Sequence, residues 1–434
     1  LKKQRDKLCV IGVGQHYDLF FGSNKYRENH LKVPAKGLIR YKANGNSYES
    51  EFYIDLENYA TIYSINSEQE DLIKKLKEQK CIEILPSQLE NKSINRFVEE
   101  LRAGFNGDIL SGSANEVAPA VFHPIINNQR DFERLKKVNA FEIDGQIMNY
   151  LEEIYIYLND MDNNDDFPVY QQIPSYYNKK LEIDTERLIY WLKTINDFQV
   201  SQINLLGGDV LAHPGFHRVI NVLLSKALAV NLYYKYDLFK EEYISLVNDS
   251  FKSFFWVIPV KELKRDFLEK TLIWSRQLPL VHWLFLITSE EEYYIAETFI
   301  EENGLVLAEM KPVFTGDNLL FFQDVVFMDE ADIQGMGLIK REVYVNQKVN
   351  RNDFGRLTVL PTGDIYANPN FPYIGKVGDE RVHSMIYREM IEGHSWLRIR
   401  NQEPCCSCIY QWFCPSPSNY ELAIGRPNLC HIKS

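Results

Sequence analysis

The chain has 434 residues, of which 45% are hydrophobic and 13% aromatic, and it carries a net charge of −12. This length and composition belong to a globular protein with two or three domains and exclude a disordered chain. The acidic balance predicts no general binding to nucleic acid or to an anionic membrane. No apolar run approaches the ~20 residues that span a bilayer, and the apolar stretch after the basic start is too short for a signal peptide. We therefore expect a cytoplasmic protein.

The first predicted domain spans residues 1–137 and mixes strands with a helix. Strand-like runs lie at Gly37–Tyr41, Ser50–Ile54 and Cys81–Leu85. An amphipathic pattern through Leu72 and Leu76 predicts a helix that leads into the third run. Strand, helix and strand at this size suit an α+β, winged-helix-like module. Residues 104–128 are rich in Gly, Asn, Ser and Pro, and we expect them to form a long connection to the next domain.

Residues 138–350 form the second predicted domain, in which strands and helices alternate. Continuous apolar runs, typical of buried parallel strands, lie at Glu153–Leu158, Gln202–Leu206, Ala229–Tyr234, Ser253–Val260, Trp283–Thr288 and Leu307–Val313. Helical patterns lie at Asp184–Asn196, Pro214–Lys226, Glu241–Asp249, Lys261–Arg276 and Glu290–Asn303. Strand and helix alternating some five or six times predict an α/β layered or barrel domain.

The third predicted domain, residues 351–434, loses this rhythm. A hairpin is expected to turn at Thr362-Gly363-Asp364, and a helix near Arg381–Ile391 leads into a tail that holds five of the seven cysteines. An odd number of cysteines, most of them in one cluster, does not fit a disulfide framework. Clustered thiols in a chain of this kind more often hold a metal.

Four of the tail cysteines have a spacing that suits a metal site. Cys405, Cys408, Cys414 and Cys430 form the pattern C-x2-C-x5-C-x15-C. A CxxC turn directs two thiolates at one ion, and the later pair completes a tetrahedron, as in structural zinc sites and [4Fe–4S] clusters. The spacing does not choose between the two. Cys406 directly follows the first ligand and is expected to point elsewhere.

A second motif lies in the middle domain, where Gly207-Gly208-Asp209 separates a buried strand from a helix. Paired glycines let the backbone approach a ligand closely, and an acidic side chain suits an ammonium. The element resembles the second strand of radical SAM enzymes, whose strand-GGE-helix segment receives the amino group of S-adenosylmethionine. The cysteine tail resembles the terminal half of a SPASM domain, an auxiliary-cluster module. Together the resemblances cover Glu153–Cys430, and they imply a partial (β/α)6 barrel with a Cys-rich, SPASM-like lobe.

The chain departs from that family at the catalytic cluster. Radical SAM chemistry needs CxxxCxxC in the loop after the first strand, and no cysteine lies between Cys81 and Cys405. The corresponding spacing falls on Tyr170, Pro174 and Tyr177, which cannot supply the thiolates. We therefore expect no radical-SAM cluster and no use of S-adenosylmethionine, with Gly207, Gly208 and Asp209 as a vestigial site.

The SPASM-like lobe departs from the family as well. Two auxiliary clusters are usual there, and one of them takes a cysteine after a GDIY-type turn and another four residues after the third tail cysteine. Ala367 and Asn368 stand at the first of these places and Ser418 at the second. The resemblance thus implies that only the site of Cys405, Cys408, Cys414 and Cys430 is complete.

This combination resembles the pseudo-radical-SAM proteins of Bacteroidetes peptide-maturation systems, including those linked to GG-type precursor peptides. The resemblance implies a catalytically inactive protein that binds a precursor peptide or a partner enzyme while a ribosomally synthesised peptide is modified. The N-terminal domain would then be a leader-peptide recognition element, which captures an extended peptide as an added strand.

Two other functions remain open from the sequence. Asp209, His213 and His217 lie close together, and the two histidines, at i and i+4, could face one ion in an active enzyme with non-radical chemistry. Against this, His213 and Pro214 also form an ordinary helix entry. Alternatively, the protein is an interaction module recruited through its cysteine lobe. No dense basic patch with interleaved aromatic residues points to a nucleic acid.

Overall fold

The computed structural model describes residues 5–10, 35–43, 46–54, 81–84, 86–103, 107–112, 145–159, 170–171, 181–195, 200–226, 228–235, 238, 240, 243, 254–278, 280–408 and 410–432. The chain divides into two compact units, residues 1–133 with 334–348, and residues 134–333 with 349–434. Within the described ranges, no helix combines the length and hydropathy that a bilayer crossing requires.

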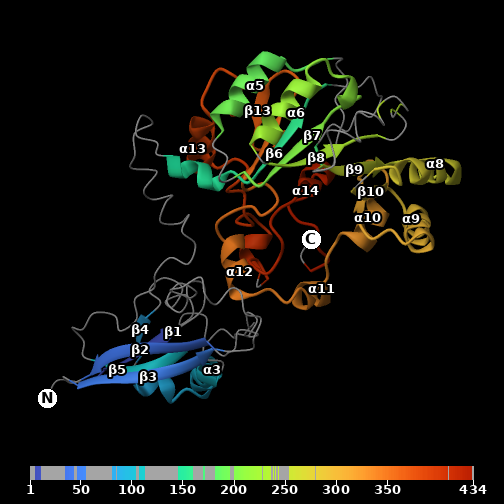
Figure 1. The fold of residues 1–434 in the computed structure, drawn as a ribbon. Helices are drawn as coiled ribbons and strands as arrows, with labels where there is room; N and C mark the ends of the chain where they lie inside the picture. The colour runs from blue at the N-terminus through green and yellow to red at the C-terminus, as the bar shows by residue number, and fades with distance from the viewer. Residues whose placement is uncertain are drawn as a thin grey trace. The chain divides into compact units, whose positions relative to one another are not determined.

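The first unit is built on antiparallel strands (Figure 1). A three-stranded sheet has the order β4-β1-β5, and β2 and β3 form a separate hairpin. The strand bounds are β1 Arg5–Val10, β2 Ala35–Ala43, β3 Asn46–Ile54, β4 Cys81–Ile84 and β5 Gly107–Gly112. The three expected strands are confirmed, while the expected helix through Leu72 and Leu76 lies outside the described residues. β5 lies within the expected long connection, and its residues Ile109 and Leu110 pair in register with β1.

Two helices follow β4 in this unit, α2 (Pro86–Leu89) and α3 (Lys92–Ala103). The Asn91 side chain caps the start of α3, because its oxygen accepts hydrogen bonds from the backbone N–H groups of Ser93 and Ile94. Phe97 and Val98 are buried and give the helix its apolar side.

The second unit contains a nine-stranded sheet of order β11-β10-β9-β8-β7-β6-β12-β13-β14. Neighbouring strands from β11 to β12 run parallel, whereas β13 and β14 add antiparallel pairs. The bounds are β6 Glu153–Tyr157, β7 Gln202–Leu206, β8 Ala229–Tyr233, β9 Phe255–Val260, β10 Val281–Ile287, β11 Ala308–Pro312, β12 Arg356–Val359, β13 Asp364–Tyr366 and β14 Gly375–Lys376. All six apolar runs of the expected parallel sheet are confirmed as strands, and so is the hairpin before the cysteine tail.

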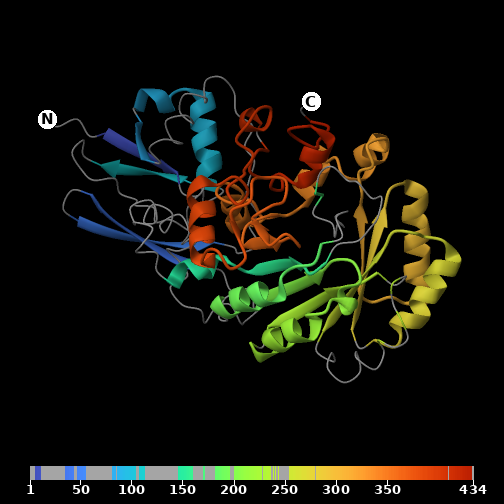
Figure 2. The same ribbon diagram turned by 90° about the horizontal axis from the view of Figure 1, so that it is seen from above.

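Helices cover one face of this sheet, as Figure 2 shows for the strands coloured green to orange. The helices are α5 Thr185–Thr194, α6 Phe216–Ser225, α8 Arg265–Ser275, α9 Glu290–Asn303 and α13 Val382–Glu392. Alternate strand residues such as Ile154 and Ile203 pack beneath them in one buried apolar cluster. The expected helix at Glu241–Asp249 lies outside the described residues except for Tyr243.

The opposite face of the sheet is polar where β12, β6, β7 and β8 begin. Glu153 is the centre of the contacts, with Arg356 Nε 2.7 Å from its Oε2 and Asn204 Nδ2 2.6 Å from its Oε1. Burial raises the pKa of Tyr155 well above its ordinary value and that of Tyr233 to about 12, so both phenols stay protonated. Toward β9 and β10 the same face becomes apolar, because Val257, Leu284 and Leu286 form a buried cluster there.

Shorter elements complete the second unit and its connections. They are η3 Gly145–Tyr150, η4 Val210–Ala212, α10 Leu319–Val325, α11 Glu330–Gly335, α12 Lys340–Asn346, η6 Cys405–Ser407 and α14 Asn419–Ile424. Residues 349–434 belong to the same compact unit as the parallel sheet, and residues 334–348 belong to the N-terminal unit. The expected division into 138–350 and 351–434 stays a prediction, and strand β12, from the later segment, joins the sheet directly beside β6.

A buried carboxylate fixes the turn after α13. Glu389 is 1% exposed, and its Oε1 accepts hydrogen bonds of 2.7 Å from the backbone N–H groups of Ser395 and Trp396. Burial raises the pKa of Glu389 despite these bonds. The turn also places the residues that follow it. Arg398 contacts Asn419, and Arg400 lines the cavity of the tail cysteines.

We expect Glu389→Ala to lower the free energy of unfolding by about 2–4 kcal/mol, since two buried N–H groups would lose their acceptor. Glu389→Gln keeps the acceptor and removes the charge. Because the folded-state pKa is raised, the wild type loses stability relative to Glu389→Gln as the pH rises through that pKa. Denaturant unfolding from acid to neutral pH measures both effects, and a constant difference between wild type and Glu389→Gln would contradict the second.

Candidate functional site

The Gly207-Gly208-Asp209 turn lies at the carboxyl end of β7, where its residues meet the end of β6. Gly207 has a φ of +139°, and a Cβ there would lie 2.5 Å from both the backbone oxygen and Oδ1 of Asn159. Asn159 Nδ2 also donates to the backbone oxygen of Asp209 at 2.8 Å. The glycine therefore permits a close approach, and the group that approaches is Asn159 of the same chain.

The Asp209 carboxylate is bound by internal donors on both oxygens. The hydroxyl of Tyr234 donates to Oδ1 at 2.6 Å, and that of Tyr243 donates to Oδ2 at 3.2 Å. Lys240 Nζ lies 3.6 Å from Oδ2, so an ammonium of the chain itself is beside the carboxylate. The acidic side chain expected to receive a ligand ammonium thus ties the segment after β8 to the end of β7.

The two histidines near Asp209 do not form a shared site. His213 is 4% exposed, its Nδ1 accepts from the backbone N–H of Gly215 at 3.1 Å, and its ring also bonds to the backbone of Ile183. Burial lowers the pKa of His213, so the ring is neutral at pH 7. His217 is exposed and its ring lies against Phe216. The arrangement at His213 is that of a structural helix entry.

The loop after β6 is described at Tyr170 and Gln171, and side-chain amides hold both. Asn370 pairs with the backbone of Tyr170, accepting from its N–H at 2.8 Å and donating to its oxygen at 2.7 Å. Gln171 makes the same two contacts with the backbone of Phe314, each 2.8 Å. Tyr170, on which the expected cluster spacing falls, is thus tied to Asn370 of the C-terminal segment. Pro174 and Tyr177 lie outside the described residues.

The four tail cysteines line one cavity, which is partly open to solvent. Cys405 and Cys408 come from the turn of η6, in which the N–H of Cys408 donates to the oxygen of Cys405 at 3.0 Å. Cys430 is brought back by a bridge to Met328. Cys406 is exposed, does not line the cavity, and donates to Glu403 instead.

Burial makes two thiols of this cavity, those of Cys405 and Cys414, hard to ionise without a cation. It raises the pKa of Cys405 and raises that of Cys414 to about 12. A metal ion or cluster would balance much of the negative charge of four thiolates, so the donor set fits the expected group. Among the described residues, no three His, Cys, Asp or Glu side chains converge closely enough to hold a single ion.

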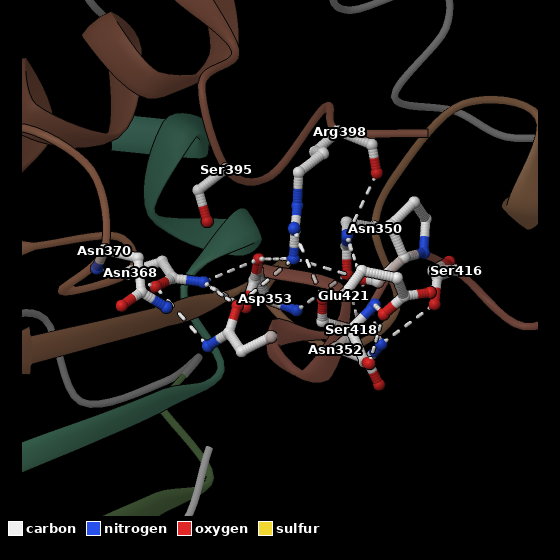
Figure 3. Close-up of polar contacts among 12 residues, drawn as sticks. Asn350, Asn352, Asp353, Asn368, Asn370, Ser395, Arg398, Ser416, Ser418 and Glu421 are labelled. Atoms are coloured by element: carbon white, nitrogen blue, oxygen red, sulfur yellow. Dashed lines mark hydrogen bonds and ion pairs between the residues drawn. The ribbon is translucent and has the colours of Figure 1, made fainter. Parts of the chain in front are cut away.

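A buried polar network joins residues between positions 350 and 421 (Figure 3). Asn368 Nδ2 donates to both carboxylate oxygens of Asp353 at 3.1 Å and to Asn419 Oδ1 at 2.8 Å. Arg398 Nη2 donates to the same Asn419 oxygen at 3.2 Å. Ser418 forms the capping box of α14 with Glu421. Asn368 and Ser418, which stand where the resembled family has cysteines, therefore make ordinary polar contacts.

Sequence reasoning missed Asp353, Arg398, Arg400 and Asn428 as residues of the lobe. They lie far apart in the chain, and polar residues in irregular segments have no periodicity to identify them. The i, i+2 spacing of Arg398 and Arg400 was the single local signal, because side chains two residues apart in an extended segment point to the same side.

No protein-family model matches the chain, and no curated protein matches it in sequence. Among solved structures it is similar to Streptococcus suis SuiB, at 11% identity and a TM-score of 0.46 over 85% of this chain and 92% of that one. For SuiB bound to its precursor peptide SuiA, the identity is 12% and the TM-score 0.45, over 79% and 88% of the two chains. Methylornithine synthase (PylB) aligns at 14% identity and a TM-score of 0.29, over 62% and 94%.

We expect Asn368→Ala to destabilise the protein by about 2–4 kcal/mol, because the buried carboxylate of Asp353 would lose a donor. Asn401→Ala removes an exposed amide of the same lobe and should change stability by less than about 0.5 kcal/mol. Thermal and denaturant unfolding of both variants measure the difference. Equal stability would mean that the network in Figure 3 contributes little.

Proposed function

We propose that this chain is a catalytically inactive, radical-SAM-like pseudoenzyme of the cytoplasm. It binds a precursor peptide, a partner maturation enzyme, or both, during the maturation of a ribosomally synthesised modified peptide. One observation carries the proposal: no cysteine lies between Cys81 and Cys405, so the loop after β6 has no thiolate for a catalytic cluster. Without that cluster, electrons have no route to S-adenosylmethionine.

The contacts of the Gly207-Gly208-Asp209 turn support the same proposal. Asn159 fills the space that the glycine leaves, and two phenols and Lys240 surround the Asp209 carboxylate. A ligand amino group would have to displace these internal contacts. The turn is in this reading a vestigial S-adenosylmethionine site. The metal-assisted alternative at Asp209, His213 and His217 is disfavoured, because His213 uses its ring for internal hydrogen bonds.

The N-terminal unit is the proposed leader-peptide recognition element. Among the described strands, β4 and β5 each pair with β1 on one side only. The outer edge of such a strand presents backbone N–H and C=O groups, on which an extended peptide can add as a further strand. We propose that the peptide is recognised by its shape and by backbone pairing. The net charge of −12 disfavours nucleic acids and anionic membranes as partners.

The SPASM-like lobe is proposed to hold one metal group on Cys405, Cys408, Cys414 and Cys430. Each iron of a [4Fe–4S] cluster takes its own thiolate, whereas a zinc ion draws four sulfur atoms to one point. The four thiolates suit a [4Fe–4S] cluster, and structural zinc is the alternative. In either case the group would tie η6 to the segment after α14.

The full-length protein, purified without oxygen, tests the proposed function, with short peptides encoded near its gene and ending in Gly-Gly as probes. We expect one such peptide to bind in isothermal titration calorimetry and to slow hydrogen exchange in β4 or β5. With S-adenosylmethionine, a reductant and the peptide together, we expect no 5′-deoxyadenosine above a blank without protein.

Enzymatic release of 5′-deoxyadenosine would overturn the assignment as a pseudoenzyme. Protection confined to the parallel-sheet unit would remove the N-terminal unit from peptide recognition. A protein that binds neither the peptide nor an enzyme encoded beside it would contradict the proposed function as a whole.

The ligand set is tested by two alanine variants of neighbouring cysteines. Cys408→Ala should lose the metal and lower the melting temperature, because three thiolates would leave the group under-coordinated. Cys406→Ala should retain full metal stoichiometry, since that thiol is exposed and faces Glu403. Iron, sulfide and zinc analysis of each variant measures the result. Equal loss in both variants, or loss in neither, would mean that the ligand set is wrong.

A further inference from the structure

We propose that Arg400 and Asn428 are positioning residues of the four-cysteine site, which donate hydrogen bonds to its ligand sulfur atoms and tune the bound group. The inference rests on the proposed metal site. Arg400 Nη1 lies 3.9 Å from Cys405 Sγ, and Asn428 Nδ2 lies 3.1 Å from Cys430 Sγ. Both side chains line the same cavity as the cysteines.

Arg400 is held in place independently of the cysteines. Its Nε donates to the backbone oxygen of Pro415 at 2.6 Å, and its Nη2 lies 2.8 Å from Glu421 Oε1. The Arg400 side chain is 9% exposed and that of Glu421 is 5% exposed. Because Glu421 also belongs to the capping box of α14, the guanidinium is fixed to a helix start. The remaining terminal nitrogen, Nη1, is the one that lies near Cys405 Sγ.

A fixed cation beside a tetrathiolate group has a definite electrostatic effect. Four thiolates carry more negative charge than a zinc ion or an oxidised [4Fe–4S] cluster supplies in positive charge, and reduction adds one further electron. The buried guanidinium stabilises the more negative state most, because charges interact strongly away from water. Hydrogen bonds to ligand sulfur atoms act in the same direction on a cluster. Arg400 and Asn428 should therefore raise the reduction potential and slow release of the metal.

Asn428 gives the same effect without a charge. Its side chain is buried and adjoins the bridge that returns Cys430 to Met328. An amide N–H that donates to sulfur withdraws electron density from the ligand and fixes its orientation, as contacts outside the ligand set do in other metal sites. The two donors reach cysteines at opposite ends of the motif, one from η6 and one from the end of the chain.

The test uses the full-length protein, purified without oxygen, with four variants. Arg400→Met removes the charge at similar length, Arg400→Lys restores it, and Asn428→Leu removes the amide. Arg426→Met is the matched control, because Arg426 is exposed and lies over the ring of Phe327. The measurements are metal and sulfide content, the rate of metal release to a chelator, and, for an iron cluster, the reduction potential from a titration followed by electron paramagnetic resonance.

We expect Arg400→Met to bind its metal but to release it roughly 10–100-fold faster, and to lower the reduction potential of a cluster. Arg400→Lys should recover part of both losses, and Asn428→Leu should shift both in the same direction by less. If Arg400→Met yields no soluble protein, Asn428→Leu against Arg426→Met decides the question. Loss of stability in Arg400→Met with release rate and potential like those of Arg426→Met would reduce Arg400 to a partner of Glu421 and overturn the inference. Wild-type protein without any metal would overturn the proposed site first, and this inference with it.

Discussion

The ion pair between Arg356 and Glu153 decides where the C-terminal lobe begins. The two residues are partners in the parallel register of β12 and β6, with Nε and Oε2 2.7 Å apart. Because side chains alternate along a strand, a slip of one residue would send Arg356 to the helix-covered face and leave Glu153 without its cation. The pair thereby fixes the register of β12, the strand that follows Asp353 of the polar network.

Local patterns were sufficient to predict the regular part of this fold. Buried parallel strands are continuous apolar runs, so Gln202–Leu206 was found at its observed bounds, and the helix Glu290–Asn303 likewise. The place of β12 beside β6 could not be found in this way, because pairing with a strand about two hundred residues earlier leaves no mark in either local sequence. The cysteine spacing identified the cavity but gave no information on Arg400, whose neighbours are distant in the chain.

Several positions that would bind a cofactor in the resembled family make polar contacts within this chain. Asp209 binds two phenols, Tyr170 pairs with the amide of Asn370, and Asn368 joins Asp353 to Asn419. Each is a short-range bond that forms without any added group. Under the proposed function, such a site would keep its shape in a cell short of iron, whereas the four-cysteine cavity would depend on metal supply.

The grouping of residues 334–348 with the N-terminal unit affects the order in which the chain folds. The ribosome makes residues 134–333 between the two parts of that unit. At ~5–20 residues per second, this interval lasts about 10–40 s. The N-terminal part of a protein usually folds first. Here, the N-terminal unit receives its last residues, 334–348, only after residues 134–333 have been made. The compact unit as a whole can be completed only after strands β6–β11 have been synthesised, although the β4 and β5 edges proposed to bind the peptide lie in its first part.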